Sequence, residues 1–152
     1  LLDSTILAVQ RITAELRPQI LDILGLVATI EWETNEFQKR TGIKCWLNVE
    51  NNVDVGKRKS TTIFRIIQEA LTNVARHASA SNVHVILKER ADHLLLEIRD
   101  DGKGIEQDQI ADPKAYGLIG IRERAFLHKG EVVFRGSPGM GTTVAIKFPK
   151  GE

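Results

Sequence analysis

One stretch of the chain places residue types suited to metal and phosphate binding at helical spacing. Four polar residues of "QEALTNVARHA" recur every three to four positions, so a helix would place them on one face. They are Glu69, Asn73, Arg76 and His77. An amide oxygen beside a carboxylate suits a hard cation such as Mg²⁺, and two basic groups one turn further suit phosphate. A solvated helix face stabilised by its own side-chain pairs is the alternative interpretation.

A second candidate site follows "HLLLEI", a run typical of a buried strand. The next residues, "RDDGKG", contain Asp100, Asp101, Gly102 and Gly104. A carboxylate here could accept a hydrogen bond from a ligand, while the glycines would let the ligand approach the backbone. A tight turn, which also favours Asp and Gly, is the alternative. The chain contains neither a G-x-G-x-x-G fingerprint nor a G-x-x-x-x-G-K-[ST] phosphate loop.

Two further glycine-rich stretches lie downstream. Gly117 and Gly120 open a predicted helix in "YGLIGIRERA". Glycine inside a helix costs ~1 kcal/mol relative to Ala, and a helix N-terminus favours phosphate, so this stretch could approach a phosphate group. Gly139, Gly141 and Thr142 lie in "SPGMGTTV", which an ordinary glycine-rich hairpin would also explain.

The elements that must position these groups follow from apolar periodicity. Helices are predicted over 2–16, 26–40, 60–77 and 118–128, with Ser60 as the N-cap of the third. Strands are predicted over 44–50, 81–90, 93–100, 131–136 and 142–149. Hairpins mixed with helices favour an α+β fold in two layers, with a mixed sheet covered on one face by helices.

The composition is that of an ordinary globular domain. The chain has 152 residues, 42% hydrophobic and 27% charged, which predicts a single domain, with an attached fragment at most. A net charge of +1 gives no general attraction for nucleic acid or anionic membranes. Cys45, the single cysteine, excludes an internal disulfide and fits a reducing compartment. No stretch approaches the ~20 apolar residues of a membrane span.

The four stretches "QEALTNVARHA", "DDGKGI", "GLIGIRERA" and "GMGTTV" together resemble the boxes of the ATP-binding catalytic domain of sensor histidine kinases. Gyrase, mismatch-repair ATPases and heat-shock chaperones share that fold, the Bergerat-type ATP-binding fold. The resemblance runs from "LRPQILDILGL" to "IKFP" and is close to the nitrate/nitrite-sensor subfamily. The chain departs from the family at "LHKG", where two glycines are usual, and lacks the phenylalanine-bearing box of longer lids.

The resemblance implies a role for each matching residue. Asn73 would ligate Mg²⁺ together with the phosphates, and Glu69 beside it would order the metal or a water, which makes these two the catalytic residues. Asp100 would accept a hydrogen bond from the adenine amino group. Gly102 and Gly104 would make room for the base. The full set of implied ATP-binding residues is Asn73, Arg76, His77, Asp100, Gly102, Gly104, Ile105, Gly117, Leu118, Gly120 and Thr142.

The remaining implied roles concern the nucleotide's surroundings. Arg76 and His77 would face phosphate, and Thr142 would close the adenine side. Residues 105–116 would form a short ATP lid, and the glycines at the start of the following helix would let it fold over the phosphates.

The resemblance also divides the chain. Residues 1–17 would be the C-terminal end of a dimerisation helix, 18–25 a joint, and 26–150 the catalytic domain. A phosphoacceptor histidine is usually followed by an acid, and no histidine of this chain is (His77, His84, His93 and His128). We therefore expect the acceptor helix before residue 1 and read the chain as part of a longer protein.

The implied activity is transfer of the ATP γ-phosphoryl group to a histidine on the dimerisation helix, and from there to an aspartate of a response regulator. The domain would be cytoplasmic, and the full-length protein a homodimer, cytoplasmic or membrane-anchored, without direct nucleic-acid contact. One alternative is a serine kinase of the same fold that acts on an anti-anti-sigma factor; the helical lead-in argues against it. Another is a degenerate binding module, against which Asn73 and Asp100 argue.

Overall fold

The structure is a computed structural model that describes residues 18–105 and 118–150. Its helices are α2 (Pro18–Leu24), α3 (Leu26–Thr41), α4 (Lys57–Asn73), the π-helix η1 (Val74–Ala78) and α6 (Leu118–Phe126). Its strands are β1 (Lys44–Val49), β2 (Asn82–Glu89), β3 (His93–Asp100), β4 (Glu131–Gly136) and β5 (Thr142–Pro149). The predicted helix over 2–16 and nearly all of the predicted lid lie outside the described residues.

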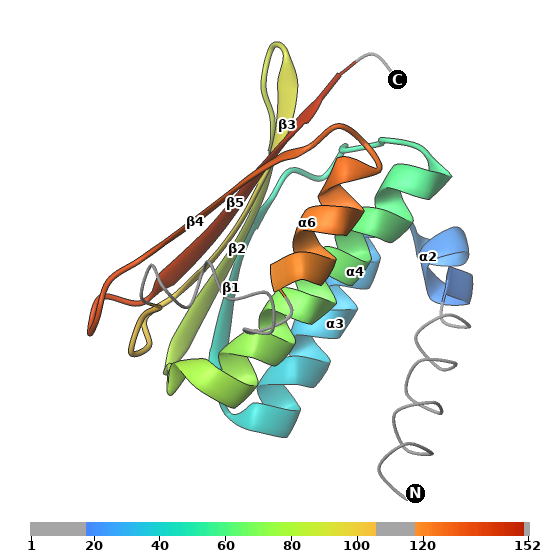
Figure 1. The fold of residues 1–152 in the computed structure, drawn as a ribbon. Helices are drawn as coiled ribbons and strands as arrows, with labels where there is room; N and C mark the ends of the chain where they lie inside the picture. The colour runs from blue at the N-terminus through green and yellow to red at the C-terminus, as the bar shows by residue number, and fades with distance from the viewer. Residues whose placement is uncertain (1–17, 106–117, 151–152) are drawn as a thin grey trace, which may run out of the picture.

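The strands of the described chain form one mixed sheet in the order β1-β2-β3-β5-β4. The β1–β2 pair is parallel, and every other neighbouring pair is antiparallel. Helices α3, α4 and α6 lie together on one face of this sheet (Figure 1). The predicted α+β class, with a mixed sheet covered on one face by helices, is confirmed.

The strand sequences divide cleanly between the two faces of the sheet. On β3, Leu94, Leu96 and Ile98 are buried toward the helices, and the period of two places Asp100 on the same face at the end of the strand. On β2 the corresponding buried residues are Val83, Val85 and Leu87. The apolar side of α4 packs against this surface, and its residues are almost completely buried. This core fixes where the polar end of β3 points.

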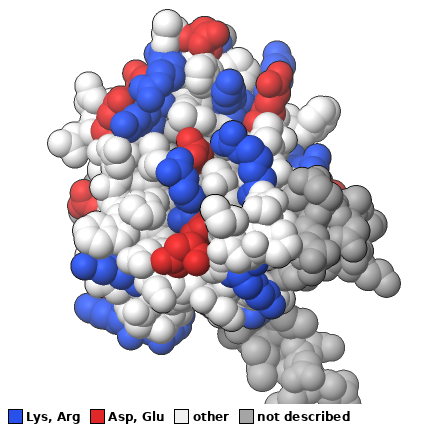
Figure 2. Space-filling model, turned by 90° about the vertical axis from the view of Figure 1, so that its left-hand side faces the viewer, with Lys and Arg blue, Asp and Glu red and all other residues white. Residues whose placement is uncertain are grey.

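The opposite face of the sheet is exposed to solvent. Acidic and basic side chains are interspersed over the part of it that the structure describes (Figure 2). Trp46 of β1 is half-exposed on this face and stacks on His84 of β2, with 6.2 Å between ring centroids. The ammonium group of Lys44 lies 4.1 Å from the centre of the indole ring.

One local prediction needs correction. Helix α4 begins at Lys57, not at Ser60, because Gly56 caps it with a φ of 81° that glycine adopts freely. The Ser60 N–H already donates to the Gly56 carbonyl as part of the first turn, so the prediction that Ser60 is an N-cap was wrong. The stretch predicted as a joint contains helix α2, which begins at Pro18. Proline suits a first helical position, where its missing N–H is not needed.

In the described ranges, 18–105 and 118–150, the helices are too short or too polar for a membrane span.

Candidate functional site

A pocket lies where the C-terminal end of the α4–η1 segment faces the ends of β3 and β5 and the start of α6. It contains about 490 Å³ of empty space, part of which is open to solvent. Its lining is mostly apolar, with a small number of polar groups, which is the usual composition of a small-molecule site. The lining residues are Ala70, Asn73, Val74, His77, Ala78, Ile98, Asp100, Gly104, Ile105, Leu118, Thr142 and Val144.

Asp100 supplies the carboxylate of this pocket. It is 9% exposed, because it continues the buried face of β3 beyond Ile98. Its Oδ1 accepts the Gly102 N–H at 2.8 Å. Burial raises the pKa of Asp100, and the backbone N–H groups of Gly102 and Thr142 offset part of that rise. A buried carboxylate with acceptor capacity at a pocket wall is suited to a ligand that offers an N–H donor.

Asp101 points the other way and has a different set of partners. Its Oδ1 accepts the backbone N–H groups of Ser81 and Asn82 at 2.8 and 2.9 Å. Its Oδ2 accepts the Asn82 side-chain amide at 2.9 Å. These bonds, led by the one from the Asn82 side chain, lower the pKa of Asp101. The two adjacent acids therefore differ: one faces the pocket, and the other ties the turn to the start of β2.

The helix that carries the polar face changes pitch inside the site. Helix α4 ends at Asn73, and the five residues of η1 continue it as a π-helix. A π-helix usually occurs as a single turn within an α-helix and is frequent at functional sites. Asn73 and His77 both line the pocket, whereas Arg76 is exposed beside it. Burial lowers the pKa of His77, and the charges of Arg76 and Lys103 lower it further, which favours a neutral imidazole.

The amide of Asn73 is available for a ligand. Among the described residues its side chain has no hydrogen-bond partner, and the same holds for the carboxylate of Glu69 one turn earlier. Glu69 is half-buried but does not line the pocket. An unsatisfied amide oxygen with a carboxylate one turn away fits a Mg²⁺ site that a bound phosphate would complete.

The turn after Asp100 is packed tightly on both sides. A Cβ on Gly102 would lie 2.0 Å from the carbonyl oxygen of Ala78, the last residue of η1. A Cβ on Gly104, whose φ is +84°, would lie 2.0 Å from the carbonyl oxygen of Ser137. Lys103 joins the same two segments, because its N–H donates to the Ala78 carbonyl and its own carbonyl accepts the Gly139 N–H. The glycines thus allow the turn after Asp100 to pack against both the π-helix and the β4–β5 turn.

The structure brings most of the proposed site residues together. Those that line the pocket are Asn73, His77, Asp100, Gly104, Ile105, Leu118 and Thr142. Glu69, Arg76, Gly102 and Gly120 adjoin it in sequence without lining it, and Gly117 lies outside the described residues.

Sequence reasoning missed the apolar lining of the pocket. Ala70, Val74, Ala78, Ile98 and Val144 were assigned no role in the site. A signal for two of them was present, because a strand places residues two apart on one face. Ile98 precedes Asp100 by two positions, and Val144 follows Thr142 by two, so each pair shares a face.

Residues 58–152 match the sequence model of the histidine kinase-, DNA gyrase B- and HSP90-like ATPase family. The chain belongs to this family. Its relatives include the signal transduction histidine-protein kinase/phosphatase DegS of Brevibacillus brevis, 35% identical over 147 residues, which are 96% of this chain and 38% of DegS. Another is the sensor histidine kinase LiaS of Bacillus subtilis, 36% identical over 142 residues, 90% of this chain and 39% of LiaS. The chain thus spans about two fifths of the length of these relatives.

Solved structures share the fold. The blue-light activated histidine kinase EL346 of Erythrobacter litoralis superposes with a TM-score of 0.77 at 22% identity, covering 97% of this chain and 49% of that one. A structure of its histidine kinase domain gives a TM-score of 0.72 at 23% identity, covering 86% of this chain and 68% of that one. The resemblance to histidine kinase ATP-binding domains is confirmed at the level of family and fold, while the nitrate/nitrite-sensor subfamily stays a prediction.

Proposed function

We propose that the pocket binds ATP and that the chain is the catalytic part of a two-component sensor histidine kinase. One observation carries this proposal: Asn73 and Asp100, from different elements, lie on one apolar-lined pocket, with the amide near one end of α4 and the buried carboxylate at the end of β3. An adenine amino group could donate to Asp100 while Ile98 and Ile105 contact the base.

Magnesium is part of the proposal. The Asn73 amide oxygen would hold the ion together with the ATP phosphates, and Glu69 would order it or a water. The ion would neutralise charge on the phosphates during phosphoryl transfer, where catalysis rests on positioning and electrostatics. Arg76, exposed beside the pocket, and His77, in its wall, are placed to meet phosphate oxygens.

The phosphoryl acceptor would be a histidine on a dimerisation helix of the same protein. Three histidines of this chain have contacts within the domain. His84 stacks on Trp46, His93 pairs with Asp92 at 2.6 Å, and His128 lies 3.0 Å from the Thr62 hydroxyl. We propose residues 1–17 as the end of that dimerisation helix, 18–25 as the joint and 26–150 as the catalytic domain, cytoplasmic in a homodimer that serves a response regulator.

The test is competitive displacement of a fluorescent nucleotide by ATP and GTP. Wild type should prefer ATP, because guanine presents an acceptor, O6, where adenine presents its amino group. The Asp100→Asn variant should narrow this preference by losing ATP affinity. A hydrogen bond to a charged group contributes ~1.5–3 kcal/mol, so the loss should be about tenfold to a hundredfold.

The matched variant for the metal is Asn73→Ala. It should weaken ATP binding in the presence of Mg²⁺ more than in its absence, since an amide that ligates a metal matters only when the metal is bound. Equal losses with and without Mg²⁺ would contradict the metal role. A wild type without preference for ATP over GTP would contradict the proposed function itself.

A further inference from the structure

A chain of side-chain hydrogen bonds runs from the open face of the sheet to the turn that follows Asp100. The Trp46 indole N–H donates to Asn82 Oδ1 at 3.0 Å. Asn82 Nδ2 donates to Asp101 Oδ2 at 2.9 Å, and Asp101 Oδ1 accepts two backbone N–H groups from Ser81 and Asn82. The Asp101 N–H in turn donates to the Asn82 carbonyl at 3.2 Å. These hydrogen bonds link β1 and β2 to the turn after β3.

The donor-to-acceptor direction of these hydrogen bonds is fixed at both ends of the series. An indole can only donate, and an ionised carboxylate can only accept. Asn82 satisfies both neighbours in one orientation alone, with its oxygen toward Trp46 and its NH₂ toward Asp101. A flipped amide would place donor against donor at one end and acceptor against acceptor at the other.

Asp101 does not face the pocket, yet it is covalently joined to Asp100. The turn has two further anchors, Gly102 against Ala78 and Gly104 against Ser137, and both lie after Asp101. On the strand side of the turn, Asp100 pairs with Val83 and Thr142 in the sheet, and the Asp101 side chain adds hydrogen bonds to Ser81 and Asn82. Its loss would let the end of β3 rotate, and the hydrogen bond that Asp100 would accept from a planar base depends on direction.

We infer that Asp101 and Asn82 are positioning residues for nucleotide selectivity, which act through Asp100 and never touch the nucleotide. This inference rests on the proposed ATP-binding function of the pocket. The Asp101→Ala variant should lose about tenfold in ATP affinity while its GTP affinity changes little. The Asn82→Ala variant should show the same change to a smaller degree, because Asp101 keeps its two backbone donors.

The decisive variant exchanges the two side chains. Asp101→Asn alone places an NH₂ group against the NH₂ of Asn82 and should impair selectivity. The double variant Asp101→Asn/Asn82→Asp restores every bond. The new amide donates to the new carboxylate, its oxygen accepts the two backbone N–H groups, and the carboxylate also accepts the indole N–H. A residue that only supported stability would not restore the ATP-to-GTP ratio in this reciprocal way.

The experiment measures ATP and GTP dissociation constants for wild type, the single variants and the double variant, with unfolding midpoints recorded to confirm that each is folded. Asp92→Ala is the matched control, since Asp92 is another exposed acid whose pKa is lowered chiefly by a side-chain hydrogen bond, at the opposite end of the β2–β3 hairpin. Wild type must bind ATP; if it does not, the proposed function fails and takes this inference with it. If wild type prefers ATP and Asp101→Ala keeps the wild-type ratio, or the double variant fails to restore it, the positioning role alone is overturned.

Discussion

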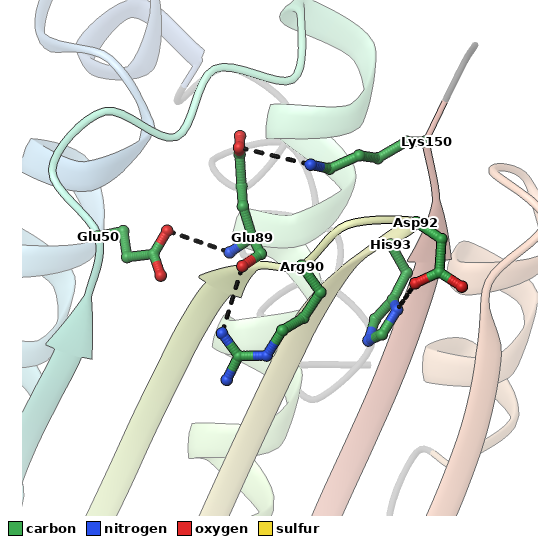
Figure 3. A network of polar contacts seen from close by, with 6 residues as sticks. All are labelled: Glu50, Glu89, Arg90, Asp92, His93 and Lys150. Atoms are coloured by element: carbon green, nitrogen blue, oxygen red, sulfur yellow. Dashed lines mark hydrogen bonds and ion pairs between the residues drawn. The ribbon is translucent and has the colours of Figure 1, made fainter.

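The two ends of the β2–β3 hairpin use the same kinds of residue in opposite ways. At the far end the strands are joined by residues 90–92, and the polar side chains around them form a surface network (Figure 3). Lys150 lies 3.7 Å from Glu89, with about two fifths of each side chain exposed, and Asp92 pairs with His93. If one of these side chains is removed, water can take its place as the hydrogen-bond partner of the others.

The end beside the pocket has acids too, but its residues are committed to packing. Asp100 is buried, and the glycines that follow it, which the far end lacks, leave no space for a methyl group. The two ends show that an aspartate at a strand end does not by itself reveal whether the turn beside it is solvated or packed against a site. Neighbours far away in sequence, Ala78 and Ser137, make the difference here.

The largest expected effect concerns Gly102. The Gly102→Ala variant must accommodate a methyl group 2.0 Å from the Ala78 carbonyl oxygen, and backbone cannot swing aside as a side chain can. We expect a loss of about 3 kcal/mol in the free energy of unfolding, measured by urea denaturation. Gly120→Ala is the matched control, because among the described residues its methyl would meet only the flexible end of the Arg124 side chain at 3.2 Å, and Ala favours helix. Equal free energies of unfolding for the two variants would contradict the inferred difference between Gly102, which packs against backbone, and Gly120, which does not.

A second test exploits the opposite pKa shifts of two acids on this hairpin. Burial raises the pKa of Asp100, so the folded state holds its proton more tightly and stability should fall as pH rises from about 4 through the folded pKa. The hydrogen bond from His93 lowers the pKa of Asp92, so its contribution should be present above about pH 4 and lost as pH falls through the folded pKa.

Urea denaturation between about pH 3 and pH 7 measures both contributions. Relative to wild type, Asp100→Asn should gain stability toward neutral pH, and Asp92→Asn should lose a small amount. The same sign for both variants would show that the two ends of the hairpin are electrostatically alike.

The smallest effect belongs to the far-end network. The Lys150→Ala variant removes an exposed ion pair and should change the free energy of unfolding by less than about 0.5 kcal/mol, with little dependence on salt. A loss above about 1 kcal/mol in the free energy of unfolding would mean that the far-end network contributes substantially to stability. The two ends of the hairpin would then differ less than we infer.

The sequence was most informative where periodicity decides structure. Alternation along β3 and β5 and the apolar stripe of α4 predicted the covered sheet, and the family resemblance implied that Asn73 and Asp100 would belong to one site. The predicted N-cap of α4 was wrong because the helix begins after Gly56 and not after Ser60. The difference depends on the positive φ of Gly56, which the amino-acid sequence does not reveal. The π-helix was not predicted either, and its last residue, Ala78, packs against Gly102, a neighbour that is distant in sequence.

The indole of Trp46 has a use beyond its hydrogen bond. The chain contains two tryptophans, Trp32 and Trp46, and only Trp46 is joined through Asn82 to the turn after β3. Its fluorescence therefore samples the turn after β3 without an attached dye. In a Trp32→Phe variant, Trp46 would be the remaining tryptophan, and its fluorescence would report on the turn after β3.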